Sequence, residues 1–146
     1  MEYSKNGLGL TEQFESCRLT AYQDDRGIWT IGWGHTGPEV VEGLVWTQAQ
    51  ADAQLLKDVS WAEANVNTHV TVPLTQNEFD ALVDFVFNVG VGNFDGSTMF
   101  RLLNQNDLSG AALQFERWDK SAGVEVAGLL RRRQAEEALF DTNDQS

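Results

Sequence analysis

The stretch from Thr75 to Gly90 most strongly constrains how this chain can fold. Thr75 and Glu78 have the spacing of a capping box, in which the two side chains satisfy backbone N–H groups at the start of a helix. Apolar residues follow at most positions: Phe79, Leu82, Val83, Phe85, Val86 and Phe87. A helix with so little polar face must be surrounded by other elements. We therefore expect a central, buried helix that ends at Gly90 and Gly92.

Further helices are expected on both sides of this one. Residues 4–16 have the pattern of a short helix. Thr47 and Gln50 have a second capping-box spacing, which predicts a long helix over the residues that follow. Three more helices are expected near residues 97–106, 109–118 and 128–140.

A hairpin is predicted between the first two helices. Residues 19–23 are extended in character, and the Asp-Asp-Arg-Gly sequence that follows has turn chemistry. Residues 28–35 are rich in Trp, Ile, Thr and Gly, which predicts a second strand. Because side chains alternate along a strand, Trp29 and Trp33 should share one face and Thr30 should lie on the other.

These elements together predict an α+β protein with a small sheet lobe and a larger helical lobe. We expect a single domain over residues 1–146, with the sheet lobe at about residues 16–45. The helical lobe would comprise about residues 1–15 and 60–141 and be joined to the sheet lobe by the long helix. A cleft between two such lobes is a usual place for an extended substrate.

The chain is strongly acidic, with a formal net charge of −12 at pH 7. Nucleic acids and anionic membranes are bound through Lys and Arg, so this charge argues against both as partners. No stretch approaches the roughly 18 apolar residues that span a bilayer, and the N-terminal residues lack the apolar core of a signal peptide. We therefore expect no membrane insertion, and we also expect a monomer. The same charge would slow encounter with an anionic polymer, most of all at low salt.

Two carboxylates flank the predicted hairpin in a way that suits hydrolysis of a glycosidic bond. That reaction needs a carboxylic acid to protonate the leaving oxygen and a second carboxylate that acts as base or nucleophile. Glu15 follows the first helix, Asp24 lies in the hairpin turn, and the second strand brings Thr30 back toward Glu15. On residue type alone, such carboxylates are more often solvated surface groups.

The whole segment ESCRLTAYQDDRGIWTIGWGH closely resembles the active-site segment of the phage lysozymes, glycoside hydrolase family 24. In that family, a Glu is followed after eight residues by an Asp, after five more by a Thr, and then by Ile-Gly-x-Gly-His. Glu15, Asp24, Thr30 and the residues up to His35 fit this pattern without a gap.

The resemblance extends over roughly residues 8–141. Tyr22 and Gly27 stand where the family has them, and the spacing selects Asp24 over Asp25, which we interpret as a turn residue. The segment WTQAQADAQLLKDV is similar to the family's long connecting helix, LTQNEFDALVDFVFNVGVGNF to its central helix, and GLLRRRQAEEALF to its Arg-rich last helix. The resemblance implies a lysozyme-like, two-lobed α+β fold.

The resemblance also implies a role for each residue of the motif. Glu15 would be the general acid, with a pKa raised so that it stays protonated near neutral pH. Asp24 would stay ionised and, with the Thr30 hydroxyl, would position the attacking water on the opposite face of the sugar. Such an inverting arrangement places the two carboxyl groups about 6.5–9.5 Å apart. The substrate would be the β-1,4 bond between N-acetylmuramic acid and N-acetylglucosamine in bacterial peptidoglycan, with no metal or cofactor.

By the same resemblance, the chain would be a phage endolysin that lyses the host cell in which it is made. It would stay in the host cytoplasm until a separate holin lets it through the inner membrane to the periplasm and cell wall. The lack of an N-terminal anchor or signal in the sequence agrees with this route.

Three further residues are expected to line the cleft or support the site. By resemblance, His35 is a structural histidine, Asn88 is a polar side chain that faces the catalytic Glu, and Tyr22 belongs to the motif. Asn88 could equally be a satisfied core amide. The family also has one arginine of the last helix near the catalytic Glu, and the sequence does not say which of residues 131–133 it is. Some of these arginines are expected to pair at the surface with the glutamates that follow.

Other activities fit the residues less well. A cysteine peptidase would use Cys17 with His35 or His69, but the charge of nearby Glu15 should raise the pKa of the thiol. A zinc amidase needs a closed set of His and Cys ligands, which one Cys and two separated His do not offer. A transglycosylase would not need the water-positioning pair. The main alternative is a non-catalytic peptidoglycan-binding module with the same fold, against which the intact catalytic residues argue.

Overall fold

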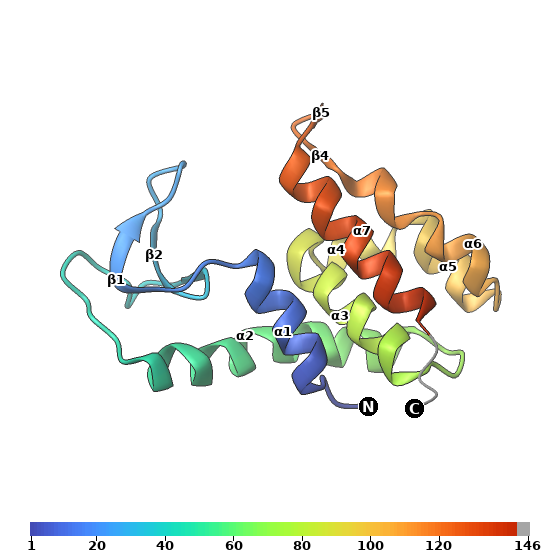
Figure 1. Ribbon diagram of the computed structural model, residues 1–146, viewed down its shortest axis with the longest axis horizontal. Helices are drawn as coiled ribbons and strands as arrows, with labels where there is room; N and C mark the ends of the chain where they lie inside the picture. The colour runs from blue at the N-terminus through green and yellow to red at the C-terminus, as the bar shows by residue number, and fades with distance from the viewer. Residues whose placement is uncertain (143–146) are drawn as a thin grey trace. The chain divides into compact units, whose positions relative to one another are not determined.

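The computed structural model in Figure 1 describes residues 1–142. These residues form seven α-helices, one 3-10 helix, a three-stranded sheet and a two-stranded sheet, so the predicted α+β class is confirmed. The chain divides into two compact units, one made of Met1–Leu10 with the chain from Trp61 onward, and the other of Thr11–Ser60. A single catalytic domain with the lobe boundaries expected from the sequence stays a prediction. Within residues 1–142, no helix is long and apolar enough to cross a membrane.

The buried helix expected from the sequence is α3 (Gln76–Val89). Every residue from Phe79 to Val86 is buried. The capping box is present: Glu78 N–H donates to Thr75 Oγ1 at 3.1 Å, and Thr75 N–H donates to Glu78 Oε1 at 2.8 Å. Gly90 caps the end of the helix with a φ of 94°, and its N–H donates to the Val86 carbonyl at 2.8 Å. The predicted start of the helix at Thr75 and its predicted end at Gly90 are therefore confirmed.

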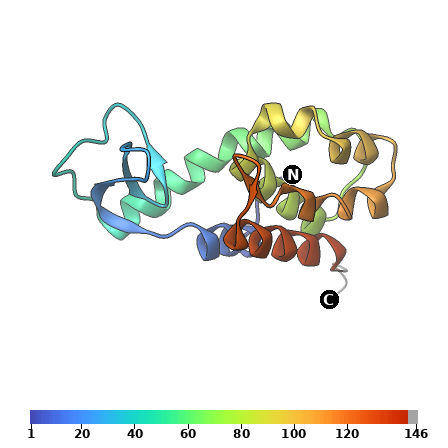
Figure 2. The ribbon, with the colours of Figure 1, turned by 90° about the horizontal axis from the view of Figure 1, so that it is seen from above.

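Shorter elements surround α3 in the unit that continues from Trp61. α7 (Ala127–Asp141) packs beside α3, as Figures 1 and 2 show, and also against the 3-10 helix η1 (Phe115–Trp118). α5 (Thr98–Asn104) packs against α6 (Leu108–Ala112). The helices predicted near residues 97–106 and 128–140 correspond to α5 and α7 and are confirmed.

Phe85 joins these elements into one core. Its ring makes edge-to-face contacts with Phe94, Phe115 and Trp118 at centroid distances of 6.2, 5.4 and 5.8 Å. Such pairs contribute about 0.5–1.5 kcal/mol beyond the burial of their area. The apolar character of α3 is thus matched by aromatic side chains from the elements around it.

Two helix predictions in this unit are wrong in detail. α4 (Val91–Asp95) begins directly after Gly90, where we expected the helical signal to stop. The positive φ of Gly90 lets the chain change direction sharply and resume a helix. The helix expected over residues 109–118 is instead α6 followed by η1, with Leu113 and Gln114 between them.

A short hairpin in this unit was not predicted. β4 (Lys120–Ser121) and β5 (Val124–Glu125) pair antiparallel across a turn in which Ala122 and Gly123 have φ values of 52° and 81°. Strands of two exposed residues carry no apolar alternation, which is the signal that predicts a strand from sequence.

Arg132 and Arg133 of α7 form a buried cluster with α3, which corrects the expectation that these arginines pair at the surface. Arg132 donates through Nε and Nη2 to the two carboxylate oxygens of Asp84 at 2.9 and 2.8 Å. Arg133 Nη2 donates to Glu136 Oε2 at 3.1 Å, and Arg133 Nε lies 2.8 Å from Glu136 Oε1 as an ion pair without hydrogen-bond geometry. Burial, and next the hydrogen bond with Asp84, raise the pKa of Glu136 well above its ordinary value.

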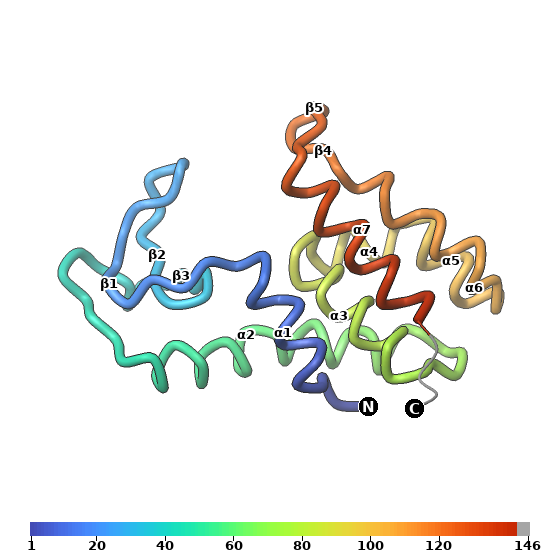
Figure 3. The backbone as a smooth tube through the Cα atoms, in the orientation of Figure 1, coloured from blue at the N-terminus to red at the C-terminus, as the bar shows by residue number. Residues whose placement is uncertain are grey.

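The unit Thr11–Ser60 contains the three-stranded antiparallel sheet, with strand order β1-β2-β3. Its elements, traced in Figure 3, are the end of α1 (Lys5–Phe14), then β1 (Arg18–Gln23), β2 (Trp29–Gly32), β3 (His35–Thr36) and the first part of α2 (Gln48–His69). Thr47 N–H donates to Gln50 Oε1 at 2.8 Å and Gln50 N–H donates to Thr47 Oγ1 at 3.1 Å. The short first helix, the hairpin and the capped long helix are therefore confirmed.

The second strand is shorter than predicted. β2 ends at Gly32, and the chain turns through Trp33 and Gly34 before β3 begins. Gly32 and Gly34 have φ values of 64° and 81°, in the left-handed region that favours glycine. The two glycines thus divide residues 28–35, and the expectation that Trp33 continues the face of Trp29 is wrong.

Replacing Arg132 with methionine should remove two charge-assisted hydrogen bonds from the buried Asp84 carboxylate. Removing one partner of a buried ion pair costs about 3–5 kcal/mol, and we expect a loss of that size in the free energy of unfolding by urea titration. Arg131→Met is the control, because Arg131 is exposed and exposed substitutions change stability by about 0.5 kcal/mol or less. Equal losses in the two variants would contradict a stabilising role for the cluster.

Candidate active site

Glu15 directly follows α1 and lies beside the turn between β2 and β3. Its N–H donates to the Thr11 carbonyl at 2.9 Å, which continues the helical hydrogen bonding by one residue. The side chain is half-buried. A Cβ atom added at Gly34 would lie 3.5 Å from Glu15 Oε2, so the backbone of Gly34 packs against the carboxyl group. The Gly-x-Gly turn therefore brings the end of the helix and the sheet together at Glu15.

Asp24 organises the turn between β1 and β2. Its Oδ1 accepts hydrogen bonds from Arg26 N–H at 2.8 Å and Ile28 N–H at 2.9 Å, and its own N–H donates to the Ile28 carbonyl at 2.9 Å. Arg26 Nη2 lies 3.2 Å from Asp24 Oδ2. The bond from Ile28 N–H is the main cause that lowers the pKa of Asp24, and the carboxyl group is therefore ionised near neutral pH. Asp25 lies in the turn, as predicted, while the side-chain hydrogen bonds that close the turn come from Asp24.

Thr30 lies in the middle of the sheet, on β2. It pairs with Tyr22 of β1 and with Thr36 of β3, and it is 4% exposed. Its hydroxyl donates to the Ile28 carbonyl at 2.9 Å. Asp24 and Thr30 are thus both fixed by hydrogen bonds to the same residue, one through its N–H and the other through its carbonyl. The 6.5–9.5 Å separation expected between the carboxyl groups of Glu15 and Asp24 stays a prediction.

His35, at the start of β3, lies between two carboxylates. Its Nδ1 is 2.8 Å from Asp58 Oδ2 and its Nε2 is 2.6 Å from Glu39 Oε1, while the ring stacks on Trp46 with the centroids 5.7 Å apart. Burial lowers the pKa of His35, but the hydrogen bonds to Glu39 and Asp58 outweigh it and raise the pKa above its ordinary value. Both ring nitrogens are engaged, which ties β3 to α2 through Asp58.

The partners of His35 were not found by sequence reasoning. Glu39 is four residues from His35, but the Gly37-Pro38 sequence between them excludes a helix and its i,i+4 signal. Asp58 is 23 residues away on α2, where nothing local marks it as a partner. Asp52, also on α2, accepts a hydrogen bond from the indole of Trp33 at 2.8 Å and was missed for the same reason.

Two other sequence-predicted residues have clear surroundings. The guanidinium of Arg18 lies over the ring of Tyr22, with its carbon 4.2 Å from the ring centroid. In the sheet, Tyr22 pairs with Thr30. Asn88 is an exposed residue of α3, not a core amide, and its Oδ1 accepts from Arg133 Nη2 at 2.9 Å. Asn88 and Glu15 belong to different units, and the expectation that they face each other stays a prediction.

The arrangement gives no support to a thiol or metal mechanism. Cys17 Sγ accepts a hydrogen bond from Gln48 Nε2 at 3.6 Å, whereas the ring nitrogens of His35 are held by carboxylates. Within residues 1–142, no group of three or more His, Cys, Asp or Glu side chains could hold a metal ion.

The surroundings of His35 predict a pH-dependent stability. Because its pKa is raised on folding, the stabilisation is fully present below the unfolded value of about 6.5 and is lost as pH rises through the folded pKa. The difference in free energy of unfolding between the wild type and His35→Gln should therefore shrink over that window. Urea titrations from about pH 5 to about pH 9 measure it, and a constant difference would contradict the assignment.

Substituting Gly34 with alanine should reduce the glycan-cleaving activity that the resemblance implies. Alanine is strained at the φ of 81°, and a change in the backbone that relieves this strain would move the turn that packs against the Glu15 carboxyl; a shift of about 1 Å in a catalytic group costs up to about a hundredfold in rate. Gly43→Ala is a matched control, because Gly43 also has a positive φ of 87° but no atom within 4 Å of the added Cβ. Both variants should lose similar stability, and equal activities would argue against contact between Gly34 and the reacting carboxyl.

Comparison with known proteins matches most of the chain to one family. The phage lysozyme family model matches residues 12–136. An endolysin of Acyrthosiphon pisum secondary endosymbiont phage 1 is 44% identical over 146 residues, covering 97% of this chain and 99% of the relative. A SAR-endolysin of Bacteriophage PS119 is 37% identical over 130 residues, covering 89% of this chain and 78% of the relative.

A solved structure gives the same result for the fold. The muramidase domain of SpmX from Asticaccaulis excentricus has a TM-score of 0.90 and 39% sequence identity, covering 97% of this chain and 99% of that chain. The lysozyme-like α+β fold implied by the sequence is thereby confirmed. The chain belongs to the phage lysozyme family.

Proposed function

We propose that this chain is an endolysin that hydrolyses the β-1,4 bond between N-acetylmuramic acid and N-acetylglucosamine in bacterial peptidoglycan, with inversion at the anomeric carbon. As a member of the phage lysozyme family, the chain is a glycoside hydrolase. The observation that carries the proposal is how Glu15, Asp24 and Thr30 are held within one unit. Asp24 and Thr30 both bind Ile28, and the carboxyl group of Glu15 lies against Gly34.

In the proposed reaction, Glu15 donates its proton to the glycosidic oxygen as the bond between that oxygen and the anomeric carbon breaks. A water molecule attacks the anomeric carbon from the opposite face and gives one proton to Asp24. The two product sugars carry the new hydroxyl groups. Glu15 regains a proton and Asp24 loses one to solvent before the next cycle.

Thr30 suits the orientation of the attacking water. Its hydroxyl hydrogen is donated to the Ile28 carbonyl, so its oxygen presents lone pairs and can accept a hydrogen bond from water. Asp24 is ionised near neutral pH, as an aspartate ordinarily is, and the Ile28 N–H lowers its pKa further; the carboxylate accepts the second hydrogen. With both hydrogens directed at the protein, a lone pair of the water oxygen faces the sugar.

The other site residues have supporting roles in this proposal. His35 holds β3 to α2 through Asp58 and transfers no proton, because both ring nitrogens are bound to carboxylates. Tyr22 packs against the strand that carries Thr30. Asn88 is held by Arg133, and its part in the site stays a prediction.

The route to the cell wall is part of the proposal. We infer that a separate holin releases the enzyme from the host cytoplasm. The relatives do not all carry the same name, since some are endolysins and others SAR-endolysins, so dependence on a holin stays a prediction. Lysis from within host cells with and without a co-expressed holin tests it.

Release of reducing sugar ends from purified peptidoglycan tests the reaction itself. Glu15→Gln and Asp24→Asn should each lower the rate by about a hundredfold or more, because each removes a proton-transfer group. Asparagine at position 24 keeps a side-chain oxygen that can accept the hydrogen bonds of the turn. Asp25→Asn is the matched control and should retain activity, since Asp24 makes the turn bonds.

Two outcomes would overturn the proposed function. If the wild type and Glu15→Gln release reducing ends at the same rate, Glu15 is not the acid. If the folded wild type binds peptidoglycan and releases none, the chain is a non-catalytic wall-binding module.

A further inference from the structure

The turn between β2 and β3, which packs against the Glu15 carboxyl, contains two glycines. Gly32 and Gly34 have φ values of 64° and 81°. Glycine is the residue with the least restricted backbone, so a turn with two of them is not held in shape by its own backbone preferences. Trp33 lies between them and carries the only side chain of the Gly-x-Gly sequence. A side-chain bond that fixes these three residues must therefore be made by Trp33.

Trp33 is bound to the first part of α2. Its indole N–H donates to Asp52 Oδ1 at 2.8 Å. An indole has one donor and no acceptor, so this bond uses its whole hydrogen-bonding capacity. Asp52 is ionised near neutral pH, as an aspartate ordinarily is, and the bond from Trp33 is the main cause that lowers its pKa further. The indole is therefore held by a charged acceptor, which makes a stronger bond than a neutral one.

The same carboxylate oxygen is connected to the segment that follows Glu15. Gln48 Nε2 donates to Asp52 Oδ1 at 2.9 Å and to Cys17 Sγ at 3.6 Å. A sulfur atom is a weak acceptor, so the bond to the carboxylate is the stronger of the two and orients the amide. Cys17 is two residues after Glu15 in the chain. Asp52 is thus linked to the turn on one side of Glu15 and to the chain that leaves Glu15 on the other.

His35 attaches the other end of the turn to the same helix. Its Nδ1 lies 2.8 Å from Asp58 Oδ2 on α2. Gly34 lies directly between Trp33 and His35 in the chain, so its backbone has an anchored residue on either side. All of these residues belong to the unit Thr11–Ser60. The bond between Trp33 and Asp52 therefore completes the support of the backbone that packs against Glu15.

We propose that Asp52 is a positioning residue for the general acid Glu15. By holding the Trp33 indole, Asp52 fixes the turn at Gly34, and the turn fixes the place of the Glu15 carboxyl. A Cβ added at Gly34 would lie 3.5 Å from Glu15 Oε2, an ordinary van der Waals distance, so a displaced turn changes the surroundings of the carboxyl directly. The inference rests on the proposed function for the role of Glu15, and it assigns Asp52 no contact with the substrate.

The rate of reducing-end release from soluble peptidoglycan fragments tests this role. Asp52→Ala and Trp33→Phe each remove the bond, and each should lower kcat about two- to tenfold, the effect of one hydrogen bond, with KM changed less than about twofold. The double variant should be no slower than Asp52→Ala, because both changes remove the same bond. Asp52→Asn keeps a side-chain oxygen that can accept from the indole and should retain most of the wild-type kcat.

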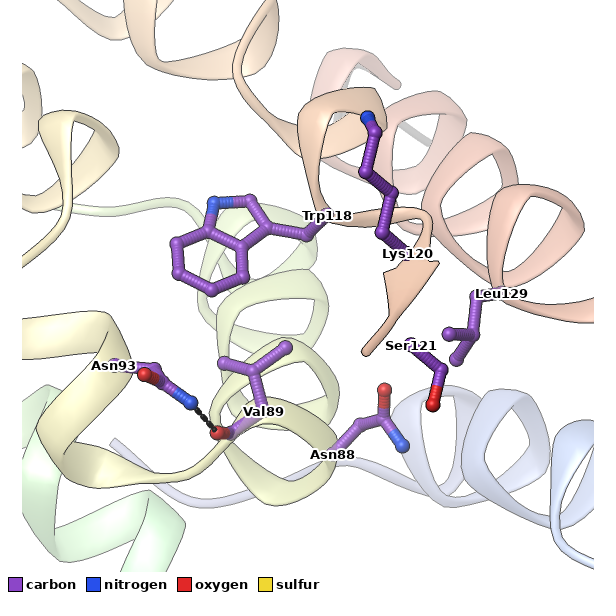
Figure 4. A pocket seen from close by; sticks show the side chains of 7 residues that line it. All are labelled: Asn88, Val89, Asn93, Trp118, Lys120, Ser121 and Leu129. Carbon is purple, nitrogen blue, oxygen red and sulfur yellow. Dashed lines mark hydrogen bonds between the residues drawn. The ribbon is translucent and has the colours of Figure 1, made fainter. Parts of the chain in front are cut away.

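Glu42→Ala is the control for the loss of a negative charge. Glu42 is an exposed acid of the same unit, and we expect its removal to leave kcat unchanged. None of the changed residues lines the pocket of about 280 Å³ that Figure 4 shows, whose side chains, among them Asn88 and Trp118, belong to the other unit. A loss of kcat in Asp52→Ala but not in Glu42→Ala would therefore come neither from net charge nor from a change in that pocket.

The NMR signal of the Glu15 side-chain carboxyl carbon tests the positioning without reference to activity. The signal should shift in Asp52→Ala and stay near its wild-type value in Asp52→Asn, which removes the same charge but keeps the acceptor. An unchanged signal in Asp52→Ala would overturn the proposal. Wild-type kcat in both Asp52→Ala and Trp33→Phe, or equal losses in Asp52→Ala and Glu42→Ala, would also overturn it. If Asp52→Ala fails to fold, the kcat of Trp33→Phe decides, because that variant breaks the same bond.

These results are separable from those for the reaction itself. If Glu15→Gln is inactive and Asp52→Ala has the wild-type kcat, the proposed function stands and this inference fails. If Glu15→Gln releases reducing ends as fast as the wild type, the proposed function fails, and the carboxyl signal alone shows whether Asp52 holds the Glu15 side chain in place.

Discussion

The hydrogen bonds that Ile28 makes with Asp24 and Thr30 are the constraint on which the candidate site depends. The Asp24 carboxylate accepts the Ile28 N–H, and the Thr30 hydroxyl donates to the Ile28 carbonyl. The first bond closes the turn and lowers the pKa of the carboxylate. The second leaves the Thr30 oxygen able to accept a hydrogen bond. The same two bonds therefore build the hairpin and, in the proposed reaction, prepare two acceptors for water. The structural role of Asp24 and its proposed chemical role cannot be separated by removing its side chain.

Two further features hold the rest of the sheet unit around this turn. Gly34 adopts a positive φ that other residues rarely adopt, and its backbone packs against the Glu15 carboxyl. His35 follows at once and is tied to α2 by Asp58. Two neighbouring residues of the Ile-Gly-x-Gly-His motif thus have different roles: Gly34 allows the backbone to approach the Glu15 carboxyl, and His35 anchors β3 to α2. In the other unit, Arg132 and Asp84 join α7 to α3 by a buried ion pair in a comparable way.

Features that depend on residues close together in the sequence could be predicted from it, whereas features that depend on distant residues or on backbone conformation could not. The capping boxes at Thr75 and Thr47 involve residues three apart, and both were predicted correctly. The pairing of Arg132 with Asp84 spans 48 residues and was not predicted; the sequence pattern predicted only surface pairs between these arginines and the glutamates that follow them. Composition suggested one strand over residues 28–35, but backbone conformation at the glycines divides it, and the sequence pattern does not encode φ. The motif spacing selected Asp24 as the functional carboxylate, whereas the turn bonds to Arg26 and Ile28 became visible only in the structure.

The central claim is that Asp24 and Thr30 deliver water to the face of the sugar opposite the leaving group. The anomeric configuration of the newly formed reducing end, recorded by NMR in the first moments of peptidoglycan cleavage, tests this most directly. Hydrolysis of the β-linkage with inversion should give the α-anomer first, followed by slow equilibration to the mixture. An initial β-anomer, or a product lighter by one water that carries an anhydro ring, would contradict the account.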